Sequence, residues 1–283
     1  MHAYKTGSDG ATASGGSGEG SRWSVVIPAY NEEDFLPATL NSLLDQTVRD
    51  AVIILVDNKS TDRTRAIMDE AAAAHPDREI RILSDERPGR IQALETGIAA
   101  TQTELVALCD ADTIYPPEYL ERATRLFDRG DDVMAAFAFG VYSDASPFAS
   151  WFARTKGAVV ASLLRNQGHT GGYGQSFRMS VMKETGGYAQ AIWPYTVADH
   201  ELSHRVAKHG RILYDRDHWC LTSARRQDRG RIDWILSERL MYNFCPAFAR
   251  DWFFYKFLEP RLKARKFFNS NLRDRDWEES ATP

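Results

Sequence analysis

The sequence predicts an α/β protein whose central sheet is mixed but mainly parallel, with helices on both faces. Two observations support this fold class. Short apolar runs alternate along the chain with segments of helical periodicity, as in consecutive βα units. Polar residues gather directly after several of those runs, where the strands of a parallel sheet open onto a ligand crevice. With 283 residues and 43% hydrophobic content, the chain could form one large α/β domain or two small ones.

Four strands are expected in the first half, at residues 24–27, 52–56, 80–83 and 105–109. Helices are expected between them. The first has apolar residues at helical spacing from 35 to 44 and Asn31 as its cap. Residues 60–62 can begin a second helix, residues 89–100 predict a third, and the proline pair at 116–117 opens a fourth.

The strict alternation ends after residue 132. The elements expected beyond it are a strand at 133–141, an amphipathic segment at 148–164, a glycine-rich stretch at 168–174, a helix at 199–208, strands at 211–214 and 220–223, and a helix at 232–244. We divide the chain into a flexible tail at 1–21, a domain at 22–245 and a C-terminal helical extension at 246–283. Aromatic and basic residues interleave in the extension, which favours a surface rich in lipid headgroups. A helix packed on the domain or on a second subunit would show the same pattern.

Charge and cysteine usage exclude several classes of protein. The formal net charge of -4 gives no overall attraction to nucleic acid, so we expect no nucleic-acid partner. Cys109, Cys220 and Cys245 lack the paired spacings of zinc sites and are expected to be reduced thiols. The chain has no apolar run of roughly eighteen residues and no basic start followed by an apolar stretch. We therefore expect a cytoplasmic protein that can contact the inner face of the membrane peripherally through its extension.

A pair of aspartates separated by one residue, Asp110 and Asp112, follows the apolar run at 105–109. Hard cations such as Mg²⁺ take oxygen ligands, and they share them between one or two carboxylates and the phosphates of a substrate. Because a buried strand delivers both carboxylates to its exposed end, this pattern indicates a metal-bound diphosphate. An acidic turn that caps the following helix would produce the same letters.

Four polar motifs follow strand ends or open a helix, in a fixed order. They are Pro28-Ala29-Tyr30-Asn31-Glu32, Asp57-Asn58-Lys59-Ser60-Thr61-Asp62, Asp110-Ala111-Asp112 and Ala198-Asp199-His200-Glu201-Leu202. This set resembles a family 2 glycosyltransferase of the GT-A fold, over residues 23–234. The resemblance implies an inverting transfer of a sugar from a nucleotide-diphosphate donor, UDP-linked, to an acceptor hydroxyl in bacterial polysaccharide or glycolipid synthesis. It also implies Mg²⁺ or Mn²⁺ as the cofactor and a DXD motif at Asp110-Ala111-Asp112.

The resemblance implies a donor site built from strand ends, the start of the third helix and a late basic segment. Its residues would be Pro28, Ala29, Tyr30, Glu32, Asp57, Arg90, Asp110, Ala111, Arg225 and Arg226. Asp57 would accept the imide hydrogen of uracil, Asp112 would coordinate the metal, and Asp110 would contact the ribose or the metal. Arg90 is preferred to Arg87 as the residue that reaches the base or the diphosphate.

The chain departs from the family pattern at three donor-side positions. Asn58 and Lys59 stand where a second aspartate and a glycine are usual, which makes the identity of the base less secure. Glu95 stands where the family often carries asparagine. His218 is a weaker candidate for a third metal ligand.

On the acceptor side, Asp199 matches the catalytic base of inverting members, although Ala198 replaces the usual glutamate before it. A carboxylate there would take the proton of the acceptor hydroxyl as its oxygen attacks the anomeric carbon. Capping of the following helix is the alternative role, and both can hold together. Residues expected to meet the acceptor are Gly172, Tyr173, Gln175 and Trp193, and Arg178 matches a frequently basic position.

Two other classes of protein share parts of this pattern. A sugar-1-phosphate nucleotidyltransferase would need a glycine-rich phosphate loop after the first strand, where this chain has Pro28-Ala29-Tyr30-Asn31. A non-catalytic nucleotide-sugar-binding protein is favoured by the departures at Asn58, Lys59, Glu95 and Ala198. Turnover of the donor would separate the second class from an enzyme. The pattern carries no prediction of the donor sugar, the acceptor or the oligomeric state.

Overall fold

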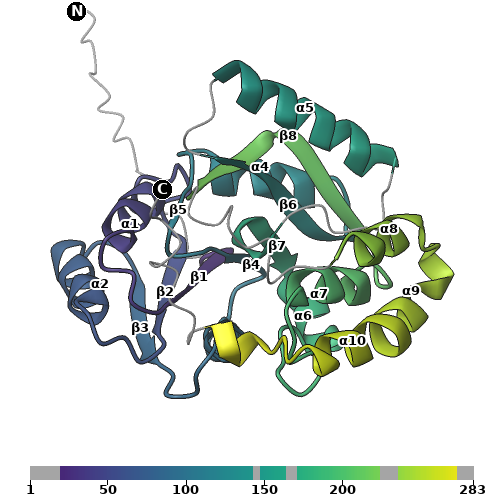
Figure 1. The fold of residues 1–283 in the computed structure, drawn as a ribbon. Helices are drawn as coiled ribbons and strands as arrows, with labels where there is room; N and C mark the ends of the chain where they lie inside the picture. The colour runs from purple at the N-terminus through teal and green to yellow at the C-terminus, as the bar shows by residue number, and fades with distance from the viewer. Residues whose placement is uncertain (1–19, 143–146, 164–170, 224–234, 273–283) are drawn as a thin grey trace, which may run out of the picture.

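The structure, a computed structural model, describes residues 20–142, 147–163, 171–223 and 235–272. The tail expected at 1–21 lies outside these ranges except for its last two residues. Within the described ranges the strands form a single sheet in the spatial order β3-β2-β1-β4-β7-β6-β8-β5. The strands are β1 (Trp23–Ala29), β2 (Val52–Asp57), β3 (Ile80–Ser84), β4 (Leu105–Leu108), β5 (Thr113–Ile114), β6 (Val133–Tyr142), β7 (Gln175–Arg178) and β8 (Arg211–Thr222). The mixed, mainly parallel sheet predicted from the sequence is confirmed (Figure 1).

The first four strands are parallel, and their register brings their carboxyl ends to one edge. Ala29 pairs with Asp57 across β1 and β2, and Asp57 pairs with Ser84 across β2 and β3. On the other side of β1, Val26 lies beside Leu108 of β4. The residues that follow these strands therefore surround the same part of the sheet, as parallel βα units require.

The second half of the sheet differs from the sequence prediction in two respects. β5 and β7 were not predicted, and β7 runs antiparallel between β4 and β6. The two strands expected at 211–214 and 220–223 are one strand, β8, parallel to β6. The polar residues in the middle of β8 lie where its pairing with β6 is irregular, because the register shifts between Phe137 and Phe139 of β6.

Helices cover both faces of the sheet. α1 (Leu36–Leu44), α2 (Thr64–Ala74) and α4 (Tyr119–Phe127) lie on one face, and α3 (Arg90–Ala99), α6 (Met179–Thr185) and α7 (Ala198–Val206) lie on the other, while α5 (Pro147–Leu163) packs on β6 and β8. The C-terminal part contains α8 (Leu236–Phe244), α9 (Arg250–Trp252), the π-helix η4 (Phe253–Leu258) and α10 (Glu259–Ala264), with 3₁₀ turns η1 (Gly172–Gly174), η3 (Ala247–Ala249) and η5 (Asn269–Leu272). No helix in the described ranges is both long enough and apolar enough to cross a bilayer.

The first two helices begin later than predicted. Asn31 adopts a left-handed conformation with φ of 51°, so the chain makes a turn before α1 starts at Leu36. Pro37 then occupies the first turn of α1, where a missing N–H costs nothing. Asp62 precedes α2, and its Oδ1 accepts the Thr64 N–H at 2.9 Å.

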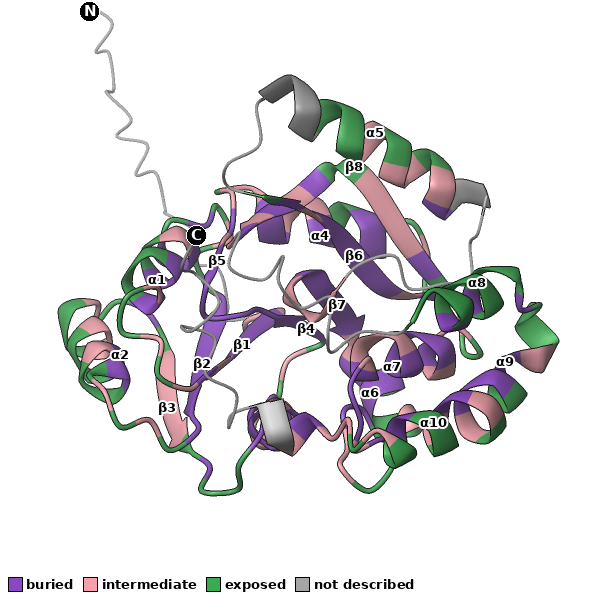
Figure 2. Cartoon of the chain, in the orientation of Figure 1, coloured by how far each residue is buried: buried purple, intermediate pink, exposed green. Residues whose placement is uncertain are grey.

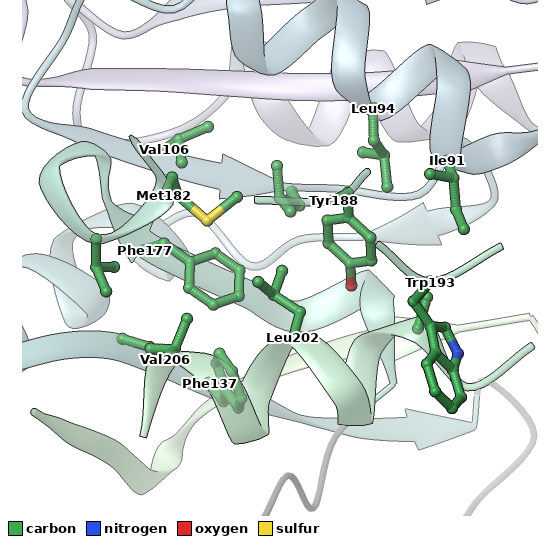
Figure 3. Packing of buried hydrophobic residues seen from close by; sticks show 14 of the residues in the cluster. Ile91, Leu94, Val106, Phe137, Phe177, Met182, Tyr188, Trp193, Leu202 and Val206 are labelled. Atoms are coloured by element: carbon green, nitrogen blue, oxygen red, sulfur yellow. The ribbon is translucent and has the colours of Figure 1, made fainter. Parts of the chain in front are cut away.

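Alternate residues of the buried strands supply two apolar layers. Val26, Ile54 and Val106 face the layer that contains α3, α6 and α7 (Figure 3), and Val25 and Ile53 face the layer of α1, α2 and α4. Buried residues of η4 and α10, namely Phe253, Phe254, Leu258 and Leu262, belong to the first layer. This stretch after residue 245 therefore shares the core of the sheet domain (Figure 2).

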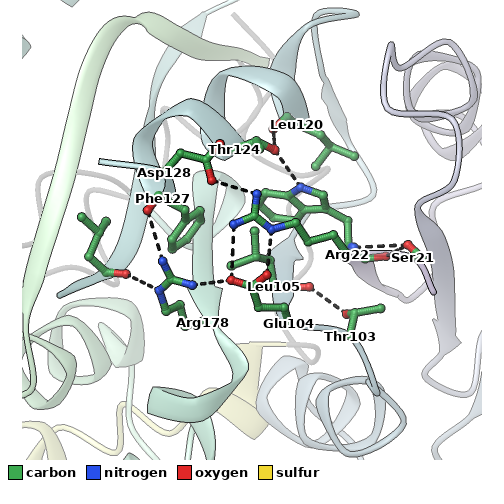
Figure 4. A network of polar contacts seen from close by, with 12 residues as sticks. Ser21, Arg22, Thr103, Glu104, Leu105, Leu120, Thr124, Phe127, Asp128 and Arg178 are labelled. Atoms are coloured by element: carbon green, nitrogen blue, oxygen red, sulfur yellow. Dashed lines mark hydrogen bonds and ion pairs between the residues drawn. The ribbon is translucent and has the colours of Figure 1, made fainter. Parts of the chain in front are cut away.

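A network of charged side chains closes the opposite end of the sheet. Arg22 pairs with Glu104 at 2.7 Å and with Asp128 at 2.8 Å, and Arg178 also pairs with Glu104 (Figure 4). Arg178 also donates hydrogen bonds to the backbone carbonyl oxygens of Val133 and Phe127. Arg178 therefore has a structural role away from the crevice and does not serve the acceptor.

Candidate functional site

The turns at the carboxyl edge of the sheet hold unusual backbone conformations. In the described part of the chain, Asn31 after β1, Lys59 after β2 and Val197 before α7 have φ values of 51°, 63° and 56°. A β-branched residue such as valine rarely adopts this region, which costs about 1–3 kcal/mol. Such strain persists where surrounding contacts enforce it, and it is concentrated at functional sites.

The turn after β1 is tied to the turn after β2. The Asn31 side-chain oxygen accepts the Thr61 N–H at 2.8 Å, and the Glu32 N–H donates to the Thr64 hydroxyl at 2.7 Å. Tyr30 and Glu32 are half-buried, as is Pro28, while Ala29 is buried. These predicted donor residues therefore lie on a fixed rim directly above the end of β1.

Asp57 ends β2, where its Oδ1 accepts the Ser60 N–H at 3.0 Å. Asn58 is buried and joins the two neighbouring turns. Its Nδ2 donates to the carbonyls of Asp85 and Arg87 at 2.8 Å each, and its Oδ1 accepts the Gly89 N–H at 3.1 Å. The departure from the family pattern at Asn58 thus has a structural explanation, since the side chain shapes the loop that leads into α3.

The same loop explains the choice between two arginines. Arg87 pairs with Asp85 at 2.7 Å and with Glu95 at 2.9 Å, so it is held against the loop itself. The hydrogen bonds from Arg87 outweigh the effect of burial and lower the pKa of Asp85 to about 2. Glu95 also accepts the Gln190 N–H at 2.6 Å, so this second departure serves packing of the loop before α7. Of the two arginines, Arg90 is the one that contacts the aspartate pair after β4, through Asp110.

Arg90 joins the aspartate motif to the glycine-rich turn. Its Nε and Nη2 both donate to Asp110 Oδ1, at 3.1 and 2.8 Å, and Nη2 also donates to the Gly172 carbonyl at 3.1 Å. A Cβ added to Gly172 would lie 2.6 Å from Nη2, so glycine permits this close approach. The Tyr115 hydroxyl accepts the Asp110 N–H at 2.9 Å and donates to the Tyr173 carbonyl at 2.8 Å. Strand β4 and turn η1 are therefore locked together around Asp110.

Asp110 and Asp112 are each 5% exposed, and Ala111 between them is buried. Within the described residues, no group of three or more His, Cys, Asp or Glu side chains is arranged to hold a metal ion. Two carboxylates at one strand end nevertheless match the donor set that Mg²⁺ or Mn²⁺ uses when substrate phosphates complete the coordination. The residues present therefore fit a metal shared with a bound diphosphate.

His218 does not extend this donor set. Its ring is fully buried in β8 and lies 4.6 Å from the Tyr119 ring, with no hydrogen-bond partner for either nitrogen among the described residues. Burial lowers the pKa of His218 to about 3. The suggestion that it could ligate the metal is wrong, because its environment is the apolar layer under α4.

Asp199 lies in the first turn of α7, and its side chain is half-buried. Its Oδ1 accepts the His200 N–H at 3.0 Å. The Asp199 carbonyl accepts the Ser203 hydroxyl at 2.6 Å and a longer contact from Gln175 Nε2 at 3.4 Å. The helix start that carries this carboxylate is thus held by polar side chains from β7 and α7.

Gln175 and Tyr188 connect Asp199 with the aspartate motif. The Tyr188 hydroxyl donates to Gln175 Oε1 at 2.8 Å, and the Arg90 guanidinium lies 5.9 Å from the centre of the Tyr188 ring. Burial raises the pKa of Tyr188 above its usual range, although the Arg90 charge opposes this rise. No sequence pattern pointed to Tyr188, which follows a glycine pair and meets Gln175 of β7 only in the folded chain.

Three of the residues predicted to meet the acceptor are buried or half-buried. Gln175 is fully buried, so it positions its neighbours and offers no surface to a ligand. Trp193 is 2% exposed, and its Nε1 donates to the Thr196 carbonyl at 2.8 Å (Figure 3). A stacking role for Trp193 is therefore wrong, because both faces of the ring pack in the core. Tyr173 is half-buried and lies against Gly140, where an added Cβ would come within 2.3 Å of its hydroxyl oxygen.

A buried ion pair supports α7 from behind. The Glu201 carboxylate is fully buried and pairs with Arg205 at 2.8 Å, while the Tyr255 hydroxyl of η4 donates to it at 2.5 Å. Arg205 also donates to the carbonyls of Thr185 and Gly187, the latter at 2.8 Å. The helix that carries Asp199 is thereby joined to the C-terminal part and to the turn before Tyr188. Arg225 and Arg226, predicted to reach the diphosphate, lie outside the described residues.

Comparison with known proteins gives a family match over more than half of the chain. The family model described as glycosyl transferase family 2 matches residues 24–186. The chain is 33% identical over 168 residues to an undecaprenyl-phosphate 4-deoxy-4-formamido-L-arabinose transferase of Edwardsiella ictaluri, a match that covers 56% of this chain and 50% of the relative. It is 36% identical over 110 residues to an uncharacterized glycosyltransferase of Nostoc, covering 39% of this chain and 34% of the relative. The chain thus spans about half the length, or less, of these curated relatives.

Two solved structures share the fold. A mannosyltransferase from Pyrobaculum calidifontis in complex with GDP-Man and Mn²⁺ superposes with a TM-score of 0.59 at 22% identity, covering 81% of this chain and 64% of that one. Residues 1–349 of TarS from S. aureus, in complex with UDP-GlcNAc, superpose with a TM-score of 0.57 at 18% identity, covering 84% of this chain and 71% of that one. At this level of identity the comparison speaks for the fold, and it confirms the predicted GT-A class.

Proposed function

Because this chain belongs to glycosyl transferase family 2, we propose that it transfers a sugar from a nucleotide-diphosphate donor to an acceptor hydroxyl, with inversion at the anomeric carbon. One observation carries the proposal. A continuous set of contacts runs from Asp110 through Arg90, Tyr188 and Gln175 to Asp199. These contacts support a common site for the acid pair and for the turn that carries the candidate base, Asp199.

The donor is proposed to be a UDP-sugar. Asp57 stands at the end of β2 next to the rim formed by Tyr30 and Glu32, where its carboxylate can accept the imide hydrogen of uracil. Arg90 adds a positive charge beside Asp110 of the acid pair, which suits a diphosphate. The basic pair Arg225 and Arg226 is proposed to approach the same diphosphate from outside the described residues.

Asp112 and Asp110 are proposed to hold Mg²⁺ or Mn²⁺ together with the donor phosphates. When bound, the ion supplies Lewis-acid neutralisation of the charge that develops on the departing diphosphate. Arg90 holds Asp110 in place from one side, and the Tyr115 hydroxyl fixes its backbone. These contacts keep the carboxylate at the strand end before any ligand arrives.

Asp199 is proposed to remove the proton of the acceptor hydroxyl, while Gly172 and Tyr173 flank the acceptor. The named function of the Edwardsiella relative favours a second kind of acceptor, a lipid phosphate. A phosphate oxygen is already ionised near neutral pH and needs no base. A hydroxyl acceptor therefore predicts loss of transfer in Asp199→Asn, whereas a lipid phosphate predicts that transfer in this variant is largely kept.

We place the protein at the inner face of the membrane in this scheme, with the acceptor carried on a lipid and the C-terminal part in peripheral contact with the bilayer. No second subunit is required by the site as described. Experiment can distinguish this function from the two alternatives, a sugar-1-phosphate nucleotidyltransferase and a non-catalytic nucleotide-sugar-binding protein. A nucleotidyltransferase would consume a nucleoside triphosphate and a sugar 1-phosphate, and a pure binding protein would show affinity without turnover.

The proposal is tested by thermal shift and donor hydrolysis, with UDP-sugars in the presence and absence of Mn²⁺. We expect UDP with Mn²⁺ to raise the melting temperature and Asp112→Ala to remove the metal-dependent part of that rise. Asp131→Ala, which removes an exposed acid at the opposite end of the sheet, is the matched control and should behave as the parent does. An Asp112→Ala protein that keeps the full metal-dependent shift would show that the acid pair is not the metal site.

A further inference from the structure

A row of large apolar side chains is exposed along the stretch from residue 235, just before α8, to the end of α9. We call this row the apolar strip. It consists of Ile235, Leu236, Leu240, Met241, Phe244, Phe248 and Trp252. Leu236 is 73% exposed, Phe244 81% and Phe248 90%. A soluble surface rarely presents so many exposed apolar side chains within one short stretch, and such patches mark interaction sites.

The inner side of α8 is fixed to the body of the protein. Glu238 is buried and accepts two hydrogen bonds from Arg265, at 2.7 and 2.8 Å. Tyr242 is buried, with its ring 5.6 Å from that of Phe253 in η4. These contacts fix which side of α8 is buried. The opposite side, which carries the apolar strip, is therefore exposed to solvent (Figure 2).

The apolar strip lies on the acceptor side of the crevice. The His200 ring is 5.5 Å from the Tyr242 ring, so α8 packs directly against the first turn of α7. Asp199 occupies that same turn. One helix, with a diameter of about 10 Å, therefore separates the apolar strip from the turn that carries the candidate base.

The C-terminal part that carries the apolar strip has a charge opposite to that of the whole chain. Residues 235–272 contain seven basic and three acidic residues, although the chain has a net charge of -4. Exposed cations in this stretch are Arg239, Lys256, Arg261, Lys263 and Lys266. Two of the three acids are held in ion pairs, Glu238 with Arg265 and Asp251 with Lys208 at 2.5 Å. Exposed apolar residues flanked by cations are the combination that binds an anionic bilayer surface.

We propose that the apolar strip inserts into the headgroup region of an anionic membrane and thereby brings the turn of Asp199 to the lipid surface. This inference deepens the proposed function, because it names the residues that make the peripheral membrane contact; membrane binding by the apolar strip does not depend on sugar transfer. Phe244 and Phe248 supply the inserted apolar area, and the exposed lysines and arginines of the same C-terminal part supply attraction to anionic headgroups.

The test is vesicle flotation of the full-length protein with phosphatidylcholine alone and with phosphatidylcholine containing phosphatidylglycerol. We expect binding to the anionic vesicles, and loss of much of that binding near 1 M salt, where the Debye length is about 3 Å. Removing two exposed phenylalanines in Phe244→Ser/Phe248→Ser should weaken the partition by about tenfold or more. The matched control is Trp151→Ser/Phe152→Ser on α5, where the side chains are 48% and 57% exposed. It should bind vesicles as the parent does.

Three results would overturn the inference: no binding of the parent to anionic vesicles, equal binding by both double variants, or a parent dimer that only Phe244→Ser/Phe248→Ser dissolves. The last result, seen by light scattering, would identify the apolar strip as an interface between copies. Donor hydrolysis without lipid should be equal in all three proteins. If hydrolysis is absent while vesicle binding follows the expected pattern, the proposed function fails and the membrane surface stands.

Discussion

The hydrogen bond between Gln175 and Tyr188 provides a quantitative test of how the site is held. Both side chains are buried, and their oxygens are 2.8 Å apart. Gln175→Met keeps a similar volume but leaves the Tyr188 hydroxyl without its acceptor, which costs about 1–3 kcal/mol in a buried position. Tyr188→Phe leaves the Gln175 oxygen without its donor, at a cost of about 1–2 kcal/mol.

The double variant separates this bond from ordinary packing. Gln175→Met/Tyr188→Phe removes both partners, so we expect its loss of stability to be smaller than the sum of the two single losses by about 1 kcal/mol. The assay is urea unfolding at equilibrium for the parent and the three variants. Tyr142→Phe, at an exposed tyrosine, is the control and should change stability by less than about 0.5 kcal/mol.

The same variants report on the proposed chemistry. Gln175 contacts the Asp199 carbonyl and the Ser203 hydroxyl at 3.4 Å each, so Gln175→Met should loosen the turn that carries the candidate base. We expect kcat for sugar transfer to fall more than the affinity for UDP. Strictly additive stability losses, or single losses below about 0.5 kcal/mol, would refute the coupling that the geometry indicates.

Three other changes test separate contacts. Gly172→Ala places a Cβ 2.6 Å from Arg90 Nη2, so we expect weaker UDP binding by calorimetry, and unchanged binding would contradict the close approach. Arg205→Met leaves the buried Glu201 without its ion-pair partner and should lower the free energy of unfolding by about 3–5 kcal/mol, with partial recovery when Glu201→Gln is added. His218 has a folded pKa of about 3, below its unfolded value of about 6.5, so the unfolded state binds the extra proton between these pH values. Stability should therefore fall as the pH drops through that window, by about 1.4 kcal/mol per pH unit at most, and His218→Phe should lose this slope in urea unfolding across pH.

The first half of the fold could be predicted because its strands are buried on both faces. Such strands appear as continuous apolar runs, and the predicted ranges match β1 to β4 to within about two residues. β5 has two residues and β7 has four, which is too short for any periodic signal. β7 also places the polar residues Gln175 and Ser176 in the core, where partners distant in the sequence satisfy or surround them.

The site was predictable where position follows from the end of a strand. Asp57, Asp110 and Asp112 lie at the carboxyl edge because parallel strands leave no other place for the residue that follows them. The burial of Gln175 and Trp193 was not predictable, since it depends on how the second half folds back over the sheet. The start of α1 was misplaced for a local reason, because Asn31 turns left-handed before the helix begins.

The hydrogen bond from Tyr255 to Glu201 makes the C-terminal helices and α7 a single exchangeable unit. A chimera joined near residue 245 would confront the Glu201 carboxylate with a side chain selected in another protein, and it would replace Phe253 and Phe254 of the shared core. Grafting a different acceptor preference onto this scaffold therefore calls for a crossover before α7, so that the helix and its supporting tyrosine come from the same parent.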